Sequence, residues 1–211
     1  MENLIIVGAG GLGRLILSQC KDDGGCGKDW KIKGFLDSRK NILDGYKYDV
    51  PIIGDPDTYV PQPDDSFLVA LGDPKEKERY AAPLLKKNAH FINLCTEITR
   101  GDNVVLGKGD LFQPKVYFGS DIVVEDFVTI ASLTIIGHDV RIGAYSHIST
   151  FVMVGGWVTI GRGVTIHPHC TILPKVKIGD GATVGAGSVV VRDVPSNVTV
   201  MGNPAKIFDF K

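Results

Sequence analysis

Residues 130–165 read IASLTI-IGHDVR-IGAYSH-ISTFVM-VGGWVT-IGRGVT when they are divided into blocks of six. Every block begins with Ile or Val, and this apolar position recurs along the chain at Leu106, Phe112, Phe118, Val124, Ile130, Ile136, Ile142, Ile148, Val154, Ile160, Ile166, Ile172, Ile178, Val184 and Val190. A period of six fits neither an amphipathic helix nor an alternating strand. It predicts a parallel β-helix of hexapeptide repeats.

A second position, four residues after the first, is also apolar or small: Val116, Ile122, Val128, Thr134, Val140, Ser146, Val152, Val158, Val164, Cys170, Val176, Ala182, Ser188 and Val194. Each block should form one short strand and one turn, so three blocks close a triangular coil of about 18 residues. Glycine often follows the first position, and we expect it to relieve tight corners where φ is positive. A Val-rich sandwich is the alternative, but its strands alternate and vary in spacing.

Residues 1–95 have a different pattern, in which short apolar strands alternate with helices. The expected strands are 4–7, 32–36, 67–71 and 91–94, the expected helices are 14–20 and 75–87, and 50–54 is a small extended piece. Alternating strand and helix predicts a parallel sheet. The sequence therefore predicts an α/β half-Rossmann domain at 1–95, followed by a β-helix domain with a C-terminal tail at 96–211.

The motif Gly8-Ala9-Gly10-Gly11-Leu12-Gly13 follows the first strand and opens the first helix. Such glycines let a phosphate approach the backbone, and the helix N-terminus favours its negative charge. Asp37, at the end of the next strand, is placed to accept from a ribose hydroxyl. A dinucleotide needs two mononucleotide halves and residues 1–95 supply one, so we expect the nucleotide of a sugar nucleotide rather than NAD. A turn that binds nothing is the alternative.

His138 is the third residue of its block, a corner position whose side chain should face outward, and Asp139 follows it. An imidazole beside a carboxylate is suited to general-base catalysis. Gly156 lies one coil above, where its N–H can stabilise an oxyanion, as acyl transfer requires. An ordinary surface histidine is the alternative. His147 lies on another face and can line the same cleft only where two subunits meet.

The composition excludes several classes of protein. The 211 residues have a formal net charge of −1 and give no electrostatic case for nucleic-acid binding. No apolar run is long enough to cross a membrane, and the first residues lack a basic signal region. The four cysteines, Cys20, Cys26, Cys95 and Cys170, have no metal-type spacing and indicate a reducing, cytoplasmic location.

A metal site is also not expected. The γ-class carbonic anhydrases share the hexapeptide prism and bind a metal through three histidines, two of them five residues apart. His167 and His169 are two residues apart, and no pair of histidines in this chain has the required spacing.

Over essentially its whole length the chain resembles the bacterial sugar acetyltransferases of the sialic acid O-acetyltransferase and nucleotide-linked amino-sugar N-acetyltransferase family. The motifs that carry the resemblance are Gly8-Ala9-Gly10-Gly11-Leu12-Gly13, Gly34-Phe35-Leu36-Asp37, Ala70-Leu71-Gly72-Asp73, residues 137–148, residues 155–161 and Gly202-Asn203-Pro204-Ala205-Lys206. The resemblance implies a left-handed prism, a homotrimer and acetyl-CoA bound between neighbouring prisms.

The resemblance also implies roles for particular residues. The catalytic group is His138 as base, Asp139 as its supporting acid and Gly156 as the thioester-binding amide. The cofactor-binding residues are His147, Gly156, Gly185, Ala186, Pro204 and Lys206. The substrate-binding residues are Gly8, Gly10, Gly11, Gly13, Asp37, Ser38 and Gly72.

Three positions depart from the family pattern. Ala131, Gly137 and the pair Thr150-Phe151 stand where the family often has Asn, an acidic residue and Pro-Gly. These positions lie near the acceptor in similar enzymes, so the acceptor group, amine or hydroxyl, stays open.

We therefore expect an acetyl-CoA-dependent acetyltransferase that acts on a sugar, in particular a nucleotide-linked one, for surface polysaccharide or glycan synthesis. A homotrimer is expected because cyclic packing can bury one of the three flat faces of the prism. The alternatives are a non-catalytic nucleotide-sugar-binding scaffold and a nucleotide-dependent oxidoreductase.

Overall fold

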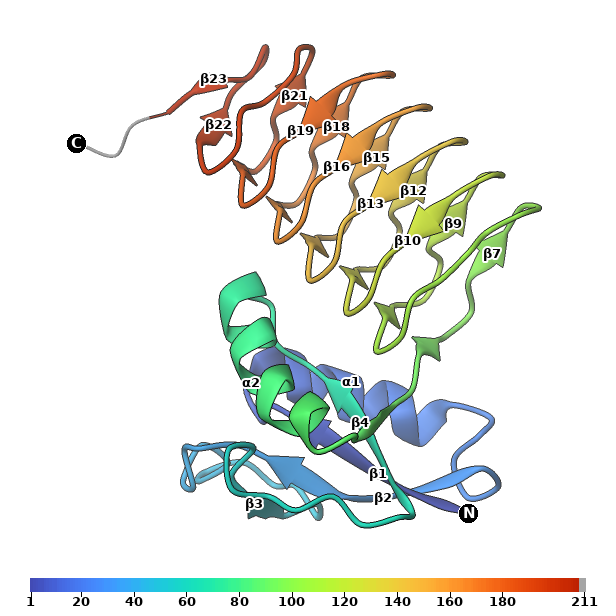
Figure 1. Ribbon diagram of the computed structural model, residues 1–211, viewed down its shortest axis with the longest axis vertical. Helices are drawn as coiled ribbons and strands as arrows, with labels where there is room; N and C mark the ends of the chain where they lie inside the picture. Colours follow the sequence, from blue (N-terminus) through green and yellow to red (C-terminus); the bar gives the residue numbers. More distant parts are fainter. Residues whose placement is uncertain (209–211) are drawn as a thin grey trace. The chain divides into compact units, whose positions relative to one another are not determined.

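The computed structural model describes residues 1–208, and the chain divides into two compact units, Met1–Leu94 and Cys95–Lys211. Figure 1 shows the first unit in blue to green and the second in green to red. The two units are built on different principles, and each is described by itself.

The first unit is a five-stranded parallel sheet with two helices (Figure 1). Its elements are β1 (Glu2–Val7), α1 (Gly11–Asp22), β2 (Trp30–Leu36), β3 (Ile52–Gly54), β4 (Asp65–Val69), α2 (Pro74–Lys86) and β5 (His90–Phe91). The order β3-β2-β1-β4-β5 confirms the parallel α/β unit. The strand order reverses next to β1, and open α/β sheets bind ligands at such a point, beyond the carboxyl ends of the strands.

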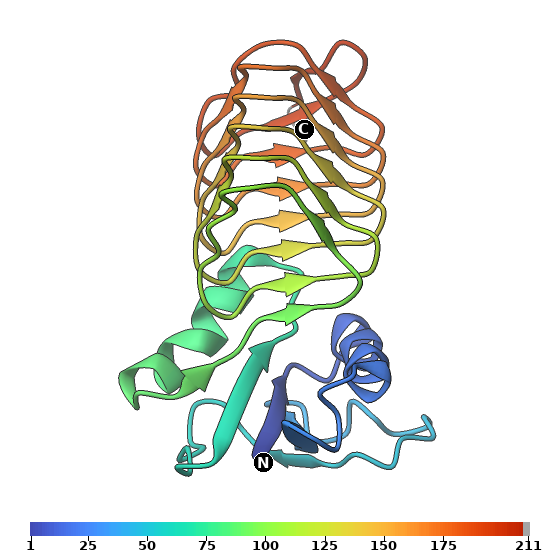
Figure 2. The ribbon, with the colours of Figure 1, turned by 90° about the vertical axis from the view of Figure 1, so that its right-hand side faces the viewer.

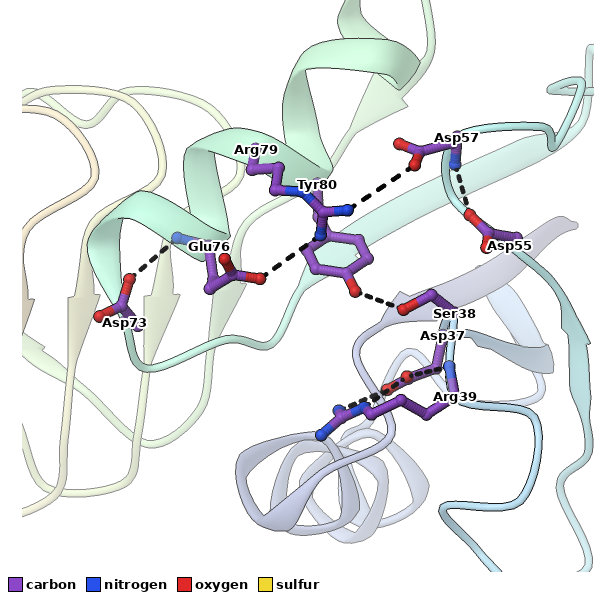
Figure 3. Close-up of polar contacts among 9 residues, drawn as sticks. All are labelled: Asp37, Ser38, Arg39, Asp55, Asp57, Asp73, Glu76, Arg79 and Tyr80. Carbon is purple, nitrogen blue, oxygen red and sulfur yellow. Dashed lines mark hydrogen bonds and ion pairs between the residues drawn. The ribbon is translucent and has the colours of Figure 1, made fainter.

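Burial and capping explain why these elements form where they do. Residues 3–7 of β1 are all buried, as expected for a central parallel strand. On α1 the residues Ile16, Leu17 and Cys20 share one face and are buried. The Asp73 side chain accepts a hydrogen bond from the Glu76 N–H at 2.9 Å, which caps α2 one residue before Pro74 (Figure 3).

The second unit is a three-sided prism of stacked coils, the left-handed β-helix expected from the repeats (Figure 2). One face consists of β10 (Val123–Val124), β13 (Arg141–Ile142), β16 (Thr159–Ile160) and β19 (Lys177–Ile178). A second face consists of β7 (Thr99–Arg100), β9 (Tyr117–Phe118), β12 (Ile135–Ile136), β15 (Met153–Val154), β18 (Thr171–Ile172) and β21 (Val189–Val190). The third consists of β6 (Leu94–Cys95), β8 (Leu111–Phe112), β11 (Thr129–Ile130), β14 (His147–Ile148), β17 (Thr165–Ile166), β20 (Thr183–Val184), β22 (Thr199–Met201) and β23 (Lys206–Ile207).

The strands pair in the register that the sequence period requires. His147 pairs with Thr165, which pairs with Thr183, so each partner lies 18 residues further along the chain. Both apolar series line the interior, and every member is buried except Leu106, which is half-buried. After β22 the chain turns back, and β23 pairs with β22 in antiparallel fashion.

The glycines that follow the first apolar position do not have the positive φ angles that we expected. Positive φ occurs two residues later, at a second glycine in half of these blocks and at another residue type in the other half, as at Asp139 (56°) and Trp157 (57°). What requires glycine is the close stacking of coils. A Cβ on Gly137 would lie 2.8 Å from the backbone nitrogen of Gly156, and Gly119 and Gly155 are equally confined.

No helix within residues 1–208 is long and apolar enough to cross a membrane.

Candidate active site

His138 lies at the corner that joins β12 to β13, and its side chain is about half exposed. Its Nδ1 is 2.8 Å from Oδ2 of Asp139. A carboxylate can only accept hydrogen bonds, so Nδ1 carries the proton and Nε2 of the neutral ring has a free lone pair. The neighbouring carboxylate therefore prepares Nε2 of His138 as a base.

Gly156 lies directly over the His138 ring, one coil further along. A Cβ on Gly156 would be 2.6 Å from His138 Nε2 and 2.7 Å from Cε1, so only glycine leaves the ring in place. The N–H of Gly156 has no hydrogen-bond partner among residues 1–208, whereas the Trp157 N–H donates to the carbonyl of His138 at 2.9 Å. A lone-pair nitrogen and an available backbone N–H thus lie side by side.

Trp157 is a residue of this corner that sequence reasoning missed. Its ring meets the His138 ring edge-to-face, with centroids 4.3 Å apart, and Lys175 Nζ lies 5.7 Å from the Trp157 centroid. Trp157 is 19 residues after His138, one coil plus one residue. The repeat period could therefore have predicted that the two side chains are neighbours. The indole forms a wall beside the imidazole although it is itself 53% exposed.

The other expected cofactor residues lie further along the prism. His147 is in β14 and half-buried, with Thr165 and Thr183 in register beyond it on the same face. Gly185 and Ala186 follow β20 on that face, and Pro204 and Lys206 belong to the closing hairpin. The side chains of Ala186, Pro204 and Lys206 are exposed.

In the first unit the glycine motif forms the turn between β1 and α1. Gly8 has φ of +99°, and a Cβ on Gly13 would lie 1.9 Å from the carbonyl oxygen of Gly8, so both positions require glycine. Gly10 is the N-cap of α1, which has no side-chain cap. The N–H groups of the first turn of α1 are therefore available to an anion.

The Asp37 carboxylate is buried and already engaged in four hydrogen bonds, and Figure 3 shows its contact with Arg39. It accepts from the Ala9 N–H, the Arg39 N–H, Arg39 Nε and Arg39 Nη2, each at 2.9 Å. Burial alone would raise the pKa of Asp37, but these donors outweigh it and lower the pKa. A carboxylate offers about four lone-pair sites, so a ribose hydroxyl would have to displace one of these donors.

The residue presented to solvent is Arg39, which sequence reasoning did not select. Two parallel hydrogen bonds to Asp37 fix its guanidinium. Arg39 Nη2 lies 3.8 Å from the position that a Cβ on Gly10 would occupy. Arg39 Nη1 has no partner among residues 1–208. A cation is thus held beside the glycine turn by a buried anion, an arrangement suited to phosphate.

A cavity of about 590 Å³ lies at the carboxyl ends of β2 and β3. It is lined by Asp37, Ser38, Lys40, Ile52, Ile53, Gly54, Asp55 and Thr58. Ser38 is oriented by a 2.6 Å hydrogen bond with the hydroxyl of Tyr80 on α2 (Figure 3). Of the expected substrate residues, Asp37 and Ser38 line the cavity, the motif glycines form the adjoining turn, and Gly72 lies beyond the end of β4.

His167 and His169 are both exposed, and the His169 ring stacks on Phe151 with centroids 4.9 Å apart. Across residues 1–208 no three His, Cys, Asp or Glu side chains are grouped in a way that could hold a metal ion.

Comparison with known proteins identifies relatives of both units. Residues 3–84 match the PglD N-terminal domain family, and residues 157–192 match the bacterial transferase hexapeptide (six repeats) family. No curated protein sequence matches the chain significantly.

Solved structures of similar proteins cover the chain from end to end. PerB from Caulobacter crescentus, crystallised with CoA and GDP-perosamine, is 26% identical, with a TM-score of 0.87 over 99% of this chain and 98% of PerB. The acetyltransferase domain of PglB from Neisseria gonorrhoeae FA1090 is 24% identical, with a TM-score of 0.74 over 99% and 100%. WeeI from Acinetobacter baumannii AYE is 23% identical, with a TM-score of 0.69 over 99% and 100%. The last two matches support the fold alone.

Proposed function

We propose that the chain, which joins a PglD N-terminal domain to hexapeptide repeats and is similar to bacterial sugar acetyltransferases, acetylates a nucleotide-linked sugar. Acetyl-CoA is the acetyl donor. The observation that carries the proposal is the corner where Nε2 of His138, held by Asp139, faces Gly156. We assign acetyl transfer to residues 96–211 and the sugar nucleotide to residues 1–95.

The groups at this corner suit a thioester, because the lone pair of His138 Nε2 and the unengaged N–H of Gly156 lie close together there. Acetyl-CoA supplies an activated thioester carbonyl. His138 Nε2 accepts the proton of the acceptor amine or hydroxyl while the nitrogen or oxygen of that acceptor group bonds to the carbonyl carbon. The Gly156 N–H donates to the oxygen on which negative charge develops. The protonated imidazole then gives its proton to the sulfur that leaves as the C–S bond breaks, and Asp139 stabilises the cation meanwhile.

We propose that Lys206 and Pro204, in the closing hairpin, and Gly185 and Ala186 hold the remainder of the donor. All four are in the last coils, and three of their side chains are exposed. A lysine there suits the phosphates of CoA. His147 would approach the donor from a neighbouring subunit.

A homotrimer completes this site. One face and its corners expose a series of large apolar side chains: Tyr117, Leu133, Ile135, Phe151, Met153, Trp157 and Leu173. A patch of this kind marks an interface, and cyclic packing of the prisms would cover it. Sedimentation that finds a fully active monomer at micromolar concentration would contradict this assembly.

Within residues 1–208 none of the four cysteines forms a disulfide, which supports a reducing, cytoplasmic location.

For the sugar nucleotide we propose that the glycine turn and Arg39 bind the diphosphate, and that Asp37 acts by holding Arg39. Arg39→Ala and Asp37→Ala should each raise KM for the sugar nucleotide on the order of tenfold, because each removes the positioned cation. KM for acetyl-CoA should stay nearly unchanged in both.

The double variant tests the linkage. If Asp37 acts through Arg39, the double variant should lose hardly more than either single variant. Lys21→Ala is the control, because it also removes one positive charge. Lys21 lies at the far end of α1, where it pairs with Asp49. Weakening of acetyl-CoA alone would argue that this unit does not hold the acceptor.

The proposed function is tested by CoA thiol release from acetyl-CoA in the presence of a panel of nucleotide-linked amino and hydroxy sugars. Release that depends on one of these sugars supports the proposal and identifies the acceptor group. Binding of a sugar nucleotide without any thiol release would indicate a scaffold instead.

A further inference from the structure

Resting on the proposed function, we propose that the cavity beside β2 and β3 binds the nucleobase of the sugar nucleotide and that Asp55 selects guanine. The chain then acts on GDP-linked sugars rather than on UDP-, CDP- or ADP-linked ones.

The cavity has the position and walls that a base requires. Asp37 links it to the glycine turn, since its carboxylate bonds both the Ala9 N–H and Arg39, so a diphosphate at the turn places its nucleoside next to the cavity. Ile52 and Ile53, both half-buried, are among the residues that line it, and they give the cavity apolar surface for a flat ring. Its volume, about 590 Å³, is within the usual range for small-molecule sites.

Asp55 lies in this cavity with a fixed and partly unused carboxylate. Oδ1 accepts the backbone N–H of Asp57 at 2.9 Å, and the Asp55 carbonyl accepts the N–H groups of Thr58 and Tyr59 at 3.2 and 2.9 Å. Oδ2 has no partner among residues 1–208. The turn therefore holds one acceptor oxygen in place before any ligand arrives.

A carboxylate can only accept, and this distinguishes the bases. Guanine presents two adjacent donors, N1–H and the N2 amino group, which match a carboxylate. Uracil places carbonyl oxygens on both sides of its one N–H, and adenine and cytosine place a ring acceptor beside their amino group. Lys40 also lines the cavity, and its ammonium suits the O6 acceptor of guanine.

Titration calorimetry with GDP, UDP, CDP and ADP tests the assignment. GDP should bind at least about tenfold more tightly than the other three, as expected for one matched pair of hydrogen bonds. Asp55→Asn keeps the oxygen that accepts from Asp57 but offers N–H groups in place of Oδ2, so the preference for GDP should disappear. Asp57→Asn is the matched control, because that exposed carboxylate does not line the cavity.

The outcomes separate this inference from the proposed function. Tighter binding of UDP, or a GDP preference that survives in Asp55→Asn, overturns the base assignment and leaves acetyl transfer to a nucleotide-linked sugar intact. If none of the four nucleotides binds at millimolar concentration while acetyl-CoA binds, both the assignment of the base and the proposal of a nucleotide-linked acceptor are wrong.

Discussion

Replacing His138 with alanine is expected to lower kcat by roughly 10²- to 10⁴-fold, the usual contribution of a general base. The side chain is half exposed at a corner, so its removal leaves no cavity in the core and the fold should survive. The Gly156 N–H stays in place, and residual activity should therefore exceed the uncatalysed rate. The affinity for acetyl-CoA should change little, because the base acts mainly as charge develops in the transition state.

His169→Ala is the control for this variant. It removes an exposed imidazole from another corner of the same prism, where the ring stacks on Phe151, and should be close to neutral. A folded His138→Ala protein with nearly unchanged kcat on its true acceptor would remove the base from the mechanism. If the acceptor is an amine that reacts in its deprotonated form without help from a base, the activity lost in His138→Ala should return as the pH is raised.

Gly156→Ala is expected to lower kcat on the order of 10²-fold although it adds a single methyl group. The new Cβ would lie 2.6 Å from His138 Nε2, so the ring must move, and a displacement of about 1 Å in a catalytic group can have an effect of this size. Gly156 is not among the residues with positive φ, so alanine should keep the backbone and its N–H in place.

The cause can be isolated by making Gly156→Ala in the His138→Ala protein. If the methyl group acts by displacing the imidazole, it should have little further effect once the imidazole is gone. An equal further loss in that background would show that the substitution damages the N–H donor or acyl binding instead.

The prism could be predicted because each strand and turn is encoded within one block of six residues. A period of six fixes which side chains face inward, and three blocks per coil fix which residues stack. The period alone is therefore enough to predict that His138, Asp139 and Gly156 meet at one corner. The expected reason for the glycines, positive φ, was wrong. Glycine is required because neighbouring coils stack closely, and the period of the sequence does not reveal the distance between coils.

The details of the first unit were less predictable. The position of Asp37 at the end of β2 followed from strand spacing, but its partners did not, because Arg39 turns back toward it and Ala9 contacts it from the end of the adjacent strand β1. The same applies to Asp55, whose loop leaves β3 and reaches the cavity through turn geometry that has no periodic signal. Trp157 was within reach of the sequence argument, since the period places it beside His138.

We propose that His138 activates a sugar nucleotide for direct attack on acetyl-CoA. A single-turnover experiment with isotope-labelled acetyl-CoA, excess enzyme and the identified sugar nucleotide tests it most directly. One labelled acetyl group should appear on the sugar for each CoA released, release should require the sugar, and His138→Ala should slow both together. Release at the same rate without the sugar, or label retained on the protein, would contradict it.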